Sequence, residues 1–413
     1  MPFTDLAELY QDLHAHPELS FAEHRTAGIA AERARALGYE VTEGIGGTGV
    51  VAVLRNGPGP TVLLRADLDG LPVLEETGLP YASVQRGRDP DGIDVPVMHA
   101  CGHDMHVTWL IGALDQLWQR RGAWSGTVLA VFQPAEELGD GARAMVEDGL
   151  FDRFDRPDVV LGQHVSPFPA GIVKYRPGPT MAGMDTVTVR LFGQGGHGSR
   201  PETTVDPVVM AAAVVLRLQT LVSREVSPLD TGVVTVGSLH AGTKANIIPA
   251  EADLRLSVRS FAEPVRQRLL AGIRRIVRAE AAASGATREP DIVGTASVPV
   301  LVNDPDTTGR VVGAIERELG TDRVATTPAI TGSEDFSVFG SAAGVPSCFW
   351  FVGGADPERY AAAEAAGRLD QDVPSNHSPR YAPVLEPTVT AGVRTLVAAA
   401  LAWLSPTQIS VPR

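Results

Sequence analysis

Short apolar runs alternate with helical patterns along the first part of the chain, and this alternation constrains the fold more than any other feature. The runs Thr61–Leu68, Thr127–Phe132 and Val159–Val165 have the length of buried strands. Segments with helical spacing of apolar residues separate them, such as Val107–Arg120. Strands that are buried on both faces and joined by helices form a mostly parallel sheet. We therefore predict an α/β domain with a mostly parallel sheet and flanking helices.

The middle of the chain follows another pattern. Asp185–Phe192 and Glu251–Ser260 alternate apolar and polar residues, as half-exposed strands do, and Glu263–Ala283 is a long amphipathic helix. The predicted order is β-α-β-β-α-β, which is typical of a ferredoxin-like α+β sandwich. Since the first pattern resumes afterwards, we predict an inserted domain at residues 180–294 and a discontinuous first domain at residues 1–179 and 295–413.

Composition excludes some classes of partner. The 413 residues are 44% hydrophobic and 20% charged, as in a soluble globular protein of two domains. A net charge of -14 argues against nucleic acid and anionic membranes, which both require a positive surface. We see no signal peptide and no run of about 18 apolar residues that would span a bilayer. Two cysteines form no disulfide framework, and we expect a cytoplasmic protein.

The segment His99-Ala-Cys-Gly-His-Asp-Met-His106 contains three of the ten histidines and one of the two cysteines. Polar residues also end the predicted strands: Asp67 and Asp69, His164, and the pair Glu136 and Glu137 shortly after the second strand. Sites in open α/β sheets gather at the carboxyl ends of strands. A thiolate, imidazoles and carboxylates together are typical ligands of first-row divalent metals.

Glu136 and Glu137 are adjacent and follow Pro134, so we expect them on a turn or a helix start, with side chains pointing in different directions. One carboxylate would then bind a metal while the other accepts a proton from a metal-bound water. An exposed acidic helix start is the commoner role of such a pair. Only the surrounding ligand candidates favour the chemical interpretation.

Other motifs leave two interpretations open. Cys101 and His103 would also suit a cysteine nucleophile with its base, but the carboxylates favour a metal. His14 and His16 resemble a ligand pair, yet a helix end before Pro17 favours a structural role. His197, among the glycines of Gly193-Gln-Gly-Gly-His-Gly198, is either a mobile side chain offered to a ligand or a turn histidine.

The motifs together resemble one family. The chain is similar to the dinuclear-metal aminoacylase and carboxypeptidase-like amidohydrolases, in the branch of hippurate hydrolase, N-acyl-amino acid amidohydrolases and indoleacetyl-amino acid hydrolases. The resemblance covers nearly the whole chain. Its markers are Leu13-His-Ala-His-Pro-Glu-Leu19, Arg65-Ala-Asp-Leu-Asp-Gly-Leu-Pro72, Met98–His106, Gln133-Pro-Ala-Glu-Glu137, Gly195-Gly-His-Gly198, Asn246-Ile-Ile-Pro249, Gly332-Ser-Glu-Asp-Phe336 and Asn376-His-Ser-Pro379.

The resemblance implies a catalytic domain with an inserted lid that also forms a homodimer. It implies two divalent ions per subunit, of zinc, manganese, cobalt or nickel. Glu136 resembles the general base, and His197 the lid histidine that reaches the partner's site and stabilises the oxyanion. Asn246 and Arg259 correspond to substrate-binding positions. The implied metal ligands are Cys101, His103, Glu137, His164 and His377.

Two positions depart from the wider family, and a third departs from the branch. Arg65-Ala-Asp67 stands where most members have His-x-Asp, so we expect Asp67 to support the site without orienting a ligand. Cys101 stands near the usual bridging aspartate. Gln163 replaces the leucine usual before His164, and we expect it to reshape the pocket wall.

The implied reaction is metal-dependent cleavage of the amide bond of small N-acyl-amino acids. Alternatives on the same site are a dipeptidase or a carbamoyl-group hydrolase. A metal-binding module without catalysis is a further alternative, against which intact Glu136 and His197 argue. Lys244, one of two lysines, either contacts an anionic substrate or lies on a surface loop.

Overall fold

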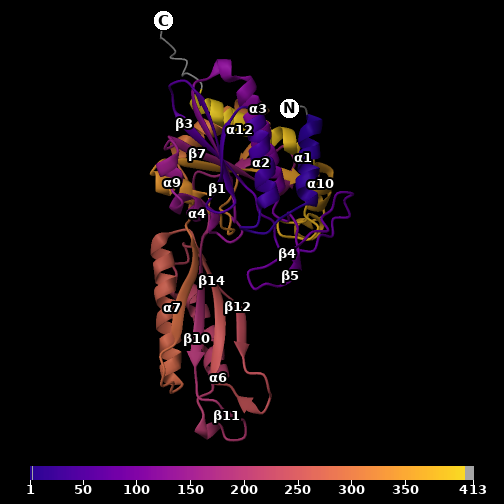
Figure 1. Cartoon of the computed structure of the whole chain (residues 1–413). Coiled ribbons are helices and arrows are strands. Elements are labelled where there is room, and N and C mark those ends of the chain that lie inside the picture. Colours follow the sequence, from indigo (N-terminus) through magenta and orange to yellow (C-terminus); the bar gives the residue numbers. More distant parts are fainter. Residues whose placement is uncertain (2, 405–413) are drawn as a thin grey trace. The chain divides into compact units, whose positions relative to one another are not determined.

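The computed structural model describes residue 1 and residues 3–404, which form two compact units (Figure 1). Unit 1 comprises Met1–Gly178, Val302–Pro328 and the chain from Asp335 onward. Unit 2 comprises Pro179–Leu301 and a short second segment, Ala329–Glu334. The predicted insertion, residues 180–294, ends seven residues before Leu301, where the main segment of unit 2 ends. The prediction also did not include the segment Ala329–Glu334.

Unit 1 is built on an eight-stranded sheet with the order β1-β2-β6-β3-β7-β18-β8-β17. Its four central strands are mutually parallel, and side chains of β3 and β6 are buried along their whole length. The antiparallel strands β1 and β2 were not predicted. The strand bounds are β1 Glu40–Ile45, β2 Gly49–Asn56, β3 Thr61–Asp67, β6 Gly126–Gln133, β7 Val159–Pro169, β8 Val173–Tyr175, β17 Val324–Thr326 and β18 Ser347–Ala355.

Helices flank this sheet, as predicted from its doubly buried strands. Helix α12 packs on α3, where Gly392 lies under the ring of the buried Trp109. A small hairpin, β4 Arg86–Arg88 with β5 Asp94–Pro96, also belongs to unit 1. The helices are α1 Phe3–Ala15, α2 His24–Ala36, α3 His103–Gln119, α4 Gly141–Glu147, α5 Leu150–Arg153, α8 Pro305–Leu319, α9 Ser337–Ala343, α10 Pro357–Ala365, α11 Leu369–Asp372 and α12 Thr388–Leu404.

Unit 2 is an antiparallel sheet with the order β12-β14-β10-β15, covered by α6 and α7, which pack on each other (Figure 1). Apolar residues of the alternating strands and of both helices form its own core. The predicted β-α-β-β-α-β order is confirmed. The bounds are β10 Gly183–Phe192, α6 Pro207–Thr220, β12 Gly232–Ala241, β14 Glu251–Ser260, α7 Glu263–Ala283 and β15 Asp291–Val298.

One helical run, which the sequence predicts as a helix over Asp206–Arg224, is apolar along much of its length. Pro207–Glu225, which is α6 with one further turn, would be able to cross a membrane by length and composition alone. In the structure Met210, Val214 and Leu218 of this run are buried in the core of unit 2. A core helix has the same composition as a membrane span, and this run is part of a folded unit.

Candidate metal centre

The five predicted metal ligands converge in unit 1 although 276 residues separate the first from the last. Cys101 Sγ lies 3.4 Å from His164 Nε2 and 3.3 Å from His377 Nε2. Glu137 Oε1 lies 3.4 Å from His377 Nε2 and 3.8 Å from His103 Nε2. These donors form overlapping groups whose ligand atoms all lie within 4.8 Å of one another. The arrangement supports the binding of divalent metal ions.

Unusual backbone conformations aim several of these side chains. Gly102, with φ of 88°, separates Cys101 from His103, which begins α3. The sequence predicted that this helix begins only at Val107, because the first turn carries no apolar repeat. His377 also has a positive φ, 69°, and its N–H donates to Ala100 O at 2.8 Å. A histidine in that region of backbone space is uncommon and is held by its surroundings.

Asp69, one of the polar residues predicted at the end of the first strand, is the carboxylate that organises the centre. Its Oδ1 accepts the ring N–H of His103 Nδ1 at 3.2 Å and the backbone N–H of Glu136 at 3.1 Å. Its Oδ2 accepts the N–H of Glu137 at 3.0 Å and the hydroxyl of Ser20 at 2.7 Å. Asp69 therefore leaves His103 Nε2 available to a metal, as carboxylates behind metal-ligating histidines do.

Asp67 lies at the buried side of the centre. Its Oδ2 accepts from Arg65 Nη1 at 2.6 Å and lies 3.6 Å from His103 Nε2. Its Oδ1 accepts from His106 Nδ1 at 2.5 Å, and His106 Nε2 in turn accepts the N–H of Val165 at 2.8 Å. Arg65 thus places a buried guanidinium beside Asp67. Both ring nitrogens of His106 form hydrogen bonds, one to Asp67 and one to the backbone of β7, which gives His106 a structural role.

Two buried atoms at the centre suit a cation. Within the described part of the chain, His103 Nε2 and Glu137 Oε1 are buried without a hydrogen-bond partner. Such atoms are costly unless something satisfies them, and a metal ion would satisfy both. Burial, and then the charges of Glu137 and Glu136, raise the pKa of the Cys101 thiol well above its usual range. A bound cation reverses that balance and favours the thiolate.

His14 is a buried structural residue, as its position favoured. Its Nδ1 lies 2.7 Å from Asp104 Oδ2 and its Nε2 lies 3.0 Å from Glu75 Oε1. Burial lowers the pKa of His14, but the hydrogen bonds to the two carboxylates outweigh it and raise the pKa to about 9. His16 bonds to the backbone oxygen of Asp12. Neither histidine belongs to a candidate metal group in the described residues.

The expectation for Gln163 was wrong. Its Nε2 donates to Gly392 O at 2.9 Å, and its Oε1 accepts from Thr395 Oγ1 at 2.7 Å. Both partners belong to α12, and Gln163 is buried. Successive strand residues point to opposite faces, so Gln163 faces this helix while His164 faces the metal centre. It shapes helix packing rather than the pocket wall.

His197 and Asn246 lie side by side in unit 2. Strand β11, Gly196–His197, pairs with β13, Ile247–Ile248, and the N–H of Gly198 donates to Asn246 O at 2.9 Å. The His197 ring is exposed, and its Nδ1 lies 2.7 Å from Ser199 Oγ. An exposed imidazole on a glycine-rich turn is available to a ligand.

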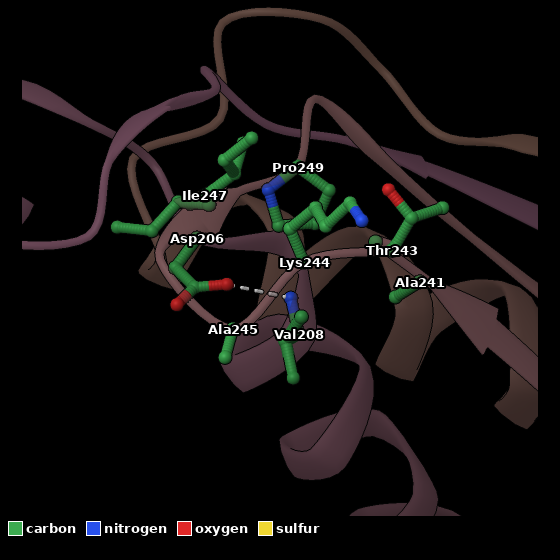
Figure 2. Close-up of a pocket in the computed structure, with 10 residues that line it drawn as sticks. Asp206, Val208, Ala241, Thr243, Lys244, Ala245, Ile247 and Pro249 are labelled. Atoms are coloured by element: carbon green, nitrogen blue, oxygen red, sulfur yellow. Dashed lines mark hydrogen bonds between the residues drawn. The ribbon is translucent and has the colours of Figure 1, made fainter.

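Arg259 and Lys244 occupy different parts of unit 2. Arg259 Nη1 donates to Thr331 O at 2.8 Å and to Ser333 Oγ at 3.1 Å, which joins β14 to the segment Ala329–Glu334. Lys244 lines an open hollow of about 450 Å³ next to the start of α6 (Figure 2). There Asp206 accepts the N–H of Val208 at 2.8 Å, so its carboxylate caps the helix.

Similarity to known proteins agrees with this geometry. The sequence profile of peptidase family M20/M25/M40 matches residues 63–373. The chain belongs to this family. The solved structure of a dinuclear metal-binding M20 peptidase from Bacillus subtilis is 28% identical, covers 97% of this chain and 98% of its own, and has a TM-score of 0.75. The mixed α/β fold predicted from the sequence is confirmed.

Two similar proteins differ in the activity that their names give. Thermostable carboxypeptidase 1 of Saccharolobus solfataricus is 37% identical over 353 residues, 84% of this chain and 85% of the relative. The N-acyl-L-amino acid amidohydrolase of Geobacillus stearothermophilus is 39% identical over 289 residues, 69% of this chain and 75% of the relative. The resemblance drawn from the motifs is confirmed. The activity that goes with this family is hydrolysis of amide bonds.

Proposed function

We propose that this M20-family protein hydrolyses the amide bond of small N-acyl-amino acids to a carboxylate and an amino acid. The observation that carries the proposal is the convergence of the five donor side chains with Glu136 beside them, 3.8 Å from His103 Nε2. The similarity to an N-acyl-L-amino acid amidohydrolase supports this substrate class.

The proposed centre holds two divalent ions per subunit, with zinc, manganese, cobalt and nickel all suited to its mixed donors. Bound ions would lower the pKa of a water molecule and polarise the acyl carbonyl. The proposed ligands are Cys101, His103, Glu137, His164 and His377. Asp67 supports them from behind through its contacts with Arg65 and His106.

Glu136 is the proposed general base. It accepts a proton as the water oxygen attacks the carbonyl carbon, and it returns a proton to the nitrogen as the C–N bond breaks. His197 donates a hydrogen bond to the developing oxyanion. Asn246, its neighbour in unit 2, contacts the substrate, and the Arg259 guanidinium binds the substrate's carboxylate.

We also propose a homodimer through unit 2, in which His197 serves the partner's site. Strand β12 is an edge of its sheet, and α6 packs beside it. The outer face of α6 is apolar: Val209 is 65% exposed and Leu216 is 74% exposed. An open edge next to exposed apolar side chains is typical of an interface. A reducing compartment suits a thiolate ligand, so we place the dimer in the cytoplasm.

A peptidase is the second candidate, since a similar relative is named a carboxypeptidase. A carbamoyl-group hydrolase and a silent metal-binding module are weaker alternatives, as Glu136 is present at the centre. A cysteine nucleophile is disfavoured because the carboxylate and histidine donors around Cys101 suit a metal ligand.

The test is amine release from acetyl, benzoyl, long-chain and indoleacetyl amino acids, with dipeptides and carbamoyl amino acids as comparison. We expect turnover of some N-acyl-amino acids by reduced, metal-loaded protein, with loss on chelation and recovery on metal addition. Turnover of dipeptides alone would favour the peptidase. Turnover that survives chelation would exclude the metal centre.

A further inference from the structure

A buried carboxylate far away in sequence holds the turn that carries Glu136 and Glu137. Glu23 immediately precedes α2 and is buried, yet its side chain makes no capping bond to that helix. Its Oε1 accepts the backbone N–H of Ala135 at 2.8 Å. Its Oε2 accepts the hydroxyl of Thr48. A carboxylate that is costly to bury therefore serves one backbone N–H just before the glutamate pair.

Ala135 has a conformation that explains this use of Glu23. Its φ of 48° lies in the left-handed region, where a Cβ costs roughly 1–2 kcal/mol. Ala135 is also buried, so its N–H would be unpaired without Glu23. A bond from an N–H to a charged carboxylate is roughly twice as strong as a neutral one. Glu23 can thus hold this backbone in place.

The rest of the turn is closed tightly. Gly141 N–H donates to Ala135 O at 3.2 Å, and a Cβ on Gly141 would lie 1.6 Å from Pro134 O. Asp69 accepts the N–H groups of the two glutamates that follow Ala135. The conformation of Ala135 therefore decides the direction in which both glutamate side chains leave the turn.

We infer that Glu23 is a positioning residue, which holds Ala135 in its left-handed conformation and thereby aims Glu136 and Glu137 at the metal centre. Its hydrogen bonds go to Ala135 and Thr48 rather than to a proposed ligand. The inference rests on the proposed function for its effect on turnover, and only on the metal site for its effect on metal affinity.

The test combines removal of the carboxylate with relief of the conformation. Glu23→Leu keeps the volume but removes the acceptor. Ala135→Gly enters the left-handed region without the Cβ penalty. The double variant E23L/A135G measures the coupling between them. Thr48→Val is the matched control, since it removes the other hydrogen-bond partner of Glu23 and leaves Oε1 for Ala135.

The measurements are kcat and KM for the best N-acyl-amino acid, and affinity for Co²⁺ followed through the absorption of the thiolate–Co²⁺ bond. We expect E23L to lower kcat by about tenfold or more, with KM within about threefold, because the base is misaligned. Affinity for Co²⁺ should fall about tenfold, because Glu137 is on the same turn. Adding A135G should restore both by about fivefold, the factor set by the Cβ penalty. Thr48→Val should stay within about threefold of the native protein.

Equal losses in E23L and E23L/A135G would mean that Glu23 acts only through packing and would overturn the inference. Native kcat and Co²⁺ affinity in E23L would overturn it too. If E23L does not fold, Glu23→Met, which also removes the acceptor, replaces it: a loss that A135G reverses supports the inference, and full activity overturns it. If the native protein hydrolyses no N-acyl-amino acid, the proposed function fails, while the Co²⁺ affinities still decide the inference.

Discussion

Glu136 and Glu137 are neighbours in the chain, but their carboxylates have different surroundings. Glu137 Oε1 lies 3.4 Å from His377 Nε2 and 3.8 Å from His103 Nε2, and Glu136 Oε2 lies 3.8 Å from His103 Nε2. Asp69 accepts both backbone N–H groups and so fixes the turn that carries the two side chains. In the proposed site, this one turn provides both a metal ligand and the general base.

These roles predict different effects of the same substitution. Glu136→Gln should keep its metal and lose about 10²–10⁴ in kcat, because the proton acceptor is gone. Glu137→Gln should lose metal, since a neutral amide is a weaker ligand than a carboxylate. Metal content and kcat, measured on both variants, separate the two. Near-native turnover by Glu136→Gln would reject it as the base.

His14 makes stability depend on pH. Its pKa is raised to about 9 in the folded protein, against about 6.5 when unfolded. A raised folded pKa contributes stability that is complete below about pH 6.5 and is lost as the pH rises through 9. We expect the free energy of unfolding in urea to fall by up to about 3 kcal/mol over that range. His14→Gln should flatten this loss, and an unchanged slope would contradict the assignment.

At the scale of elements, patterns of apolar residues predicted the strands of six or more residues, except β1 and β2. The order of strands and helices in unit 2 was predicted correctly because its strands alternate apolar and polar residues and its helices are amphipathic. The hairpin β1–β2 was missed, although Gly49–Asn56 is an apolar run as clear as its neighbours. Asp69 was predicted at the end of the first strand together with Asp67, but its hydrogen bonds to His103 and to the backbone of Glu136 and Glu137 were not.

Glu23 lies beyond such reasoning. Its partner Ala135 is 112 residues away, and the contact is to a backbone N–H, so no residue type at position 135 reveals it. The side of the sheet on which Gln163 lies was likewise not predictable, because its partner helix α12 is distant in sequence and meets it only in the folded chain. A cluster of ligand candidates was predictable because metals select few side-chain types. A hydrogen bond to a backbone N–H does not depend on the side chain at that position, so no residue type there indicates it.

The packing of α12 on α3 predicts opposite effects of two glycine substitutions. Gly392→Ala would place a Cβ 2.1 Å from Trp109 Cε2, and overpacking of this kind typically costs about 1–3 kcal/mol. Gly28→Ala lies within α2 with nothing inside 4 Å, and should gain about 0.5–1 kcal/mol from the reduced backbone entropy of alanine. Urea unfolding of both variants is the measurement, and equal stabilities would refute the packing argument.

At the scale of the whole molecule, the proposed dimer predicts how mass and activity change together. The double variant Val209→Lys with Leu216→Lys places two charges on the exposed face of α6 and should sediment as a 43.6 kDa monomer, where the native protein has about twice that mass. If His197 serves the partner, this monomer should lose about 10²–10³ in kcat, as His197→Ala should.

Val293→Lys is the control for that experiment. Val293 is 55% exposed on β15, at the opposite edge of the same sheet, so the charged variant should stay dimeric and active. A monomer from Val293→Lys, or a dimer from the α6 variant, would show that the interface lies elsewhere. An active monomer would contradict the role of His197 in the partner's site.

The path of the chain through its two units has a mechanical consequence. Unit 2 is entered after Gly178 and left before Val302, and it is entered again for Ala329–Glu334, while both ends of the described chain belong to unit 1. Tension applied at the two ends of the chain therefore bears first on unit 1. Unit 2 experiences force only after unit 1 has unfolded. Stretching the chain would therefore separate the candidate metal ligands before it extends the four-stranded sheet of unit 2.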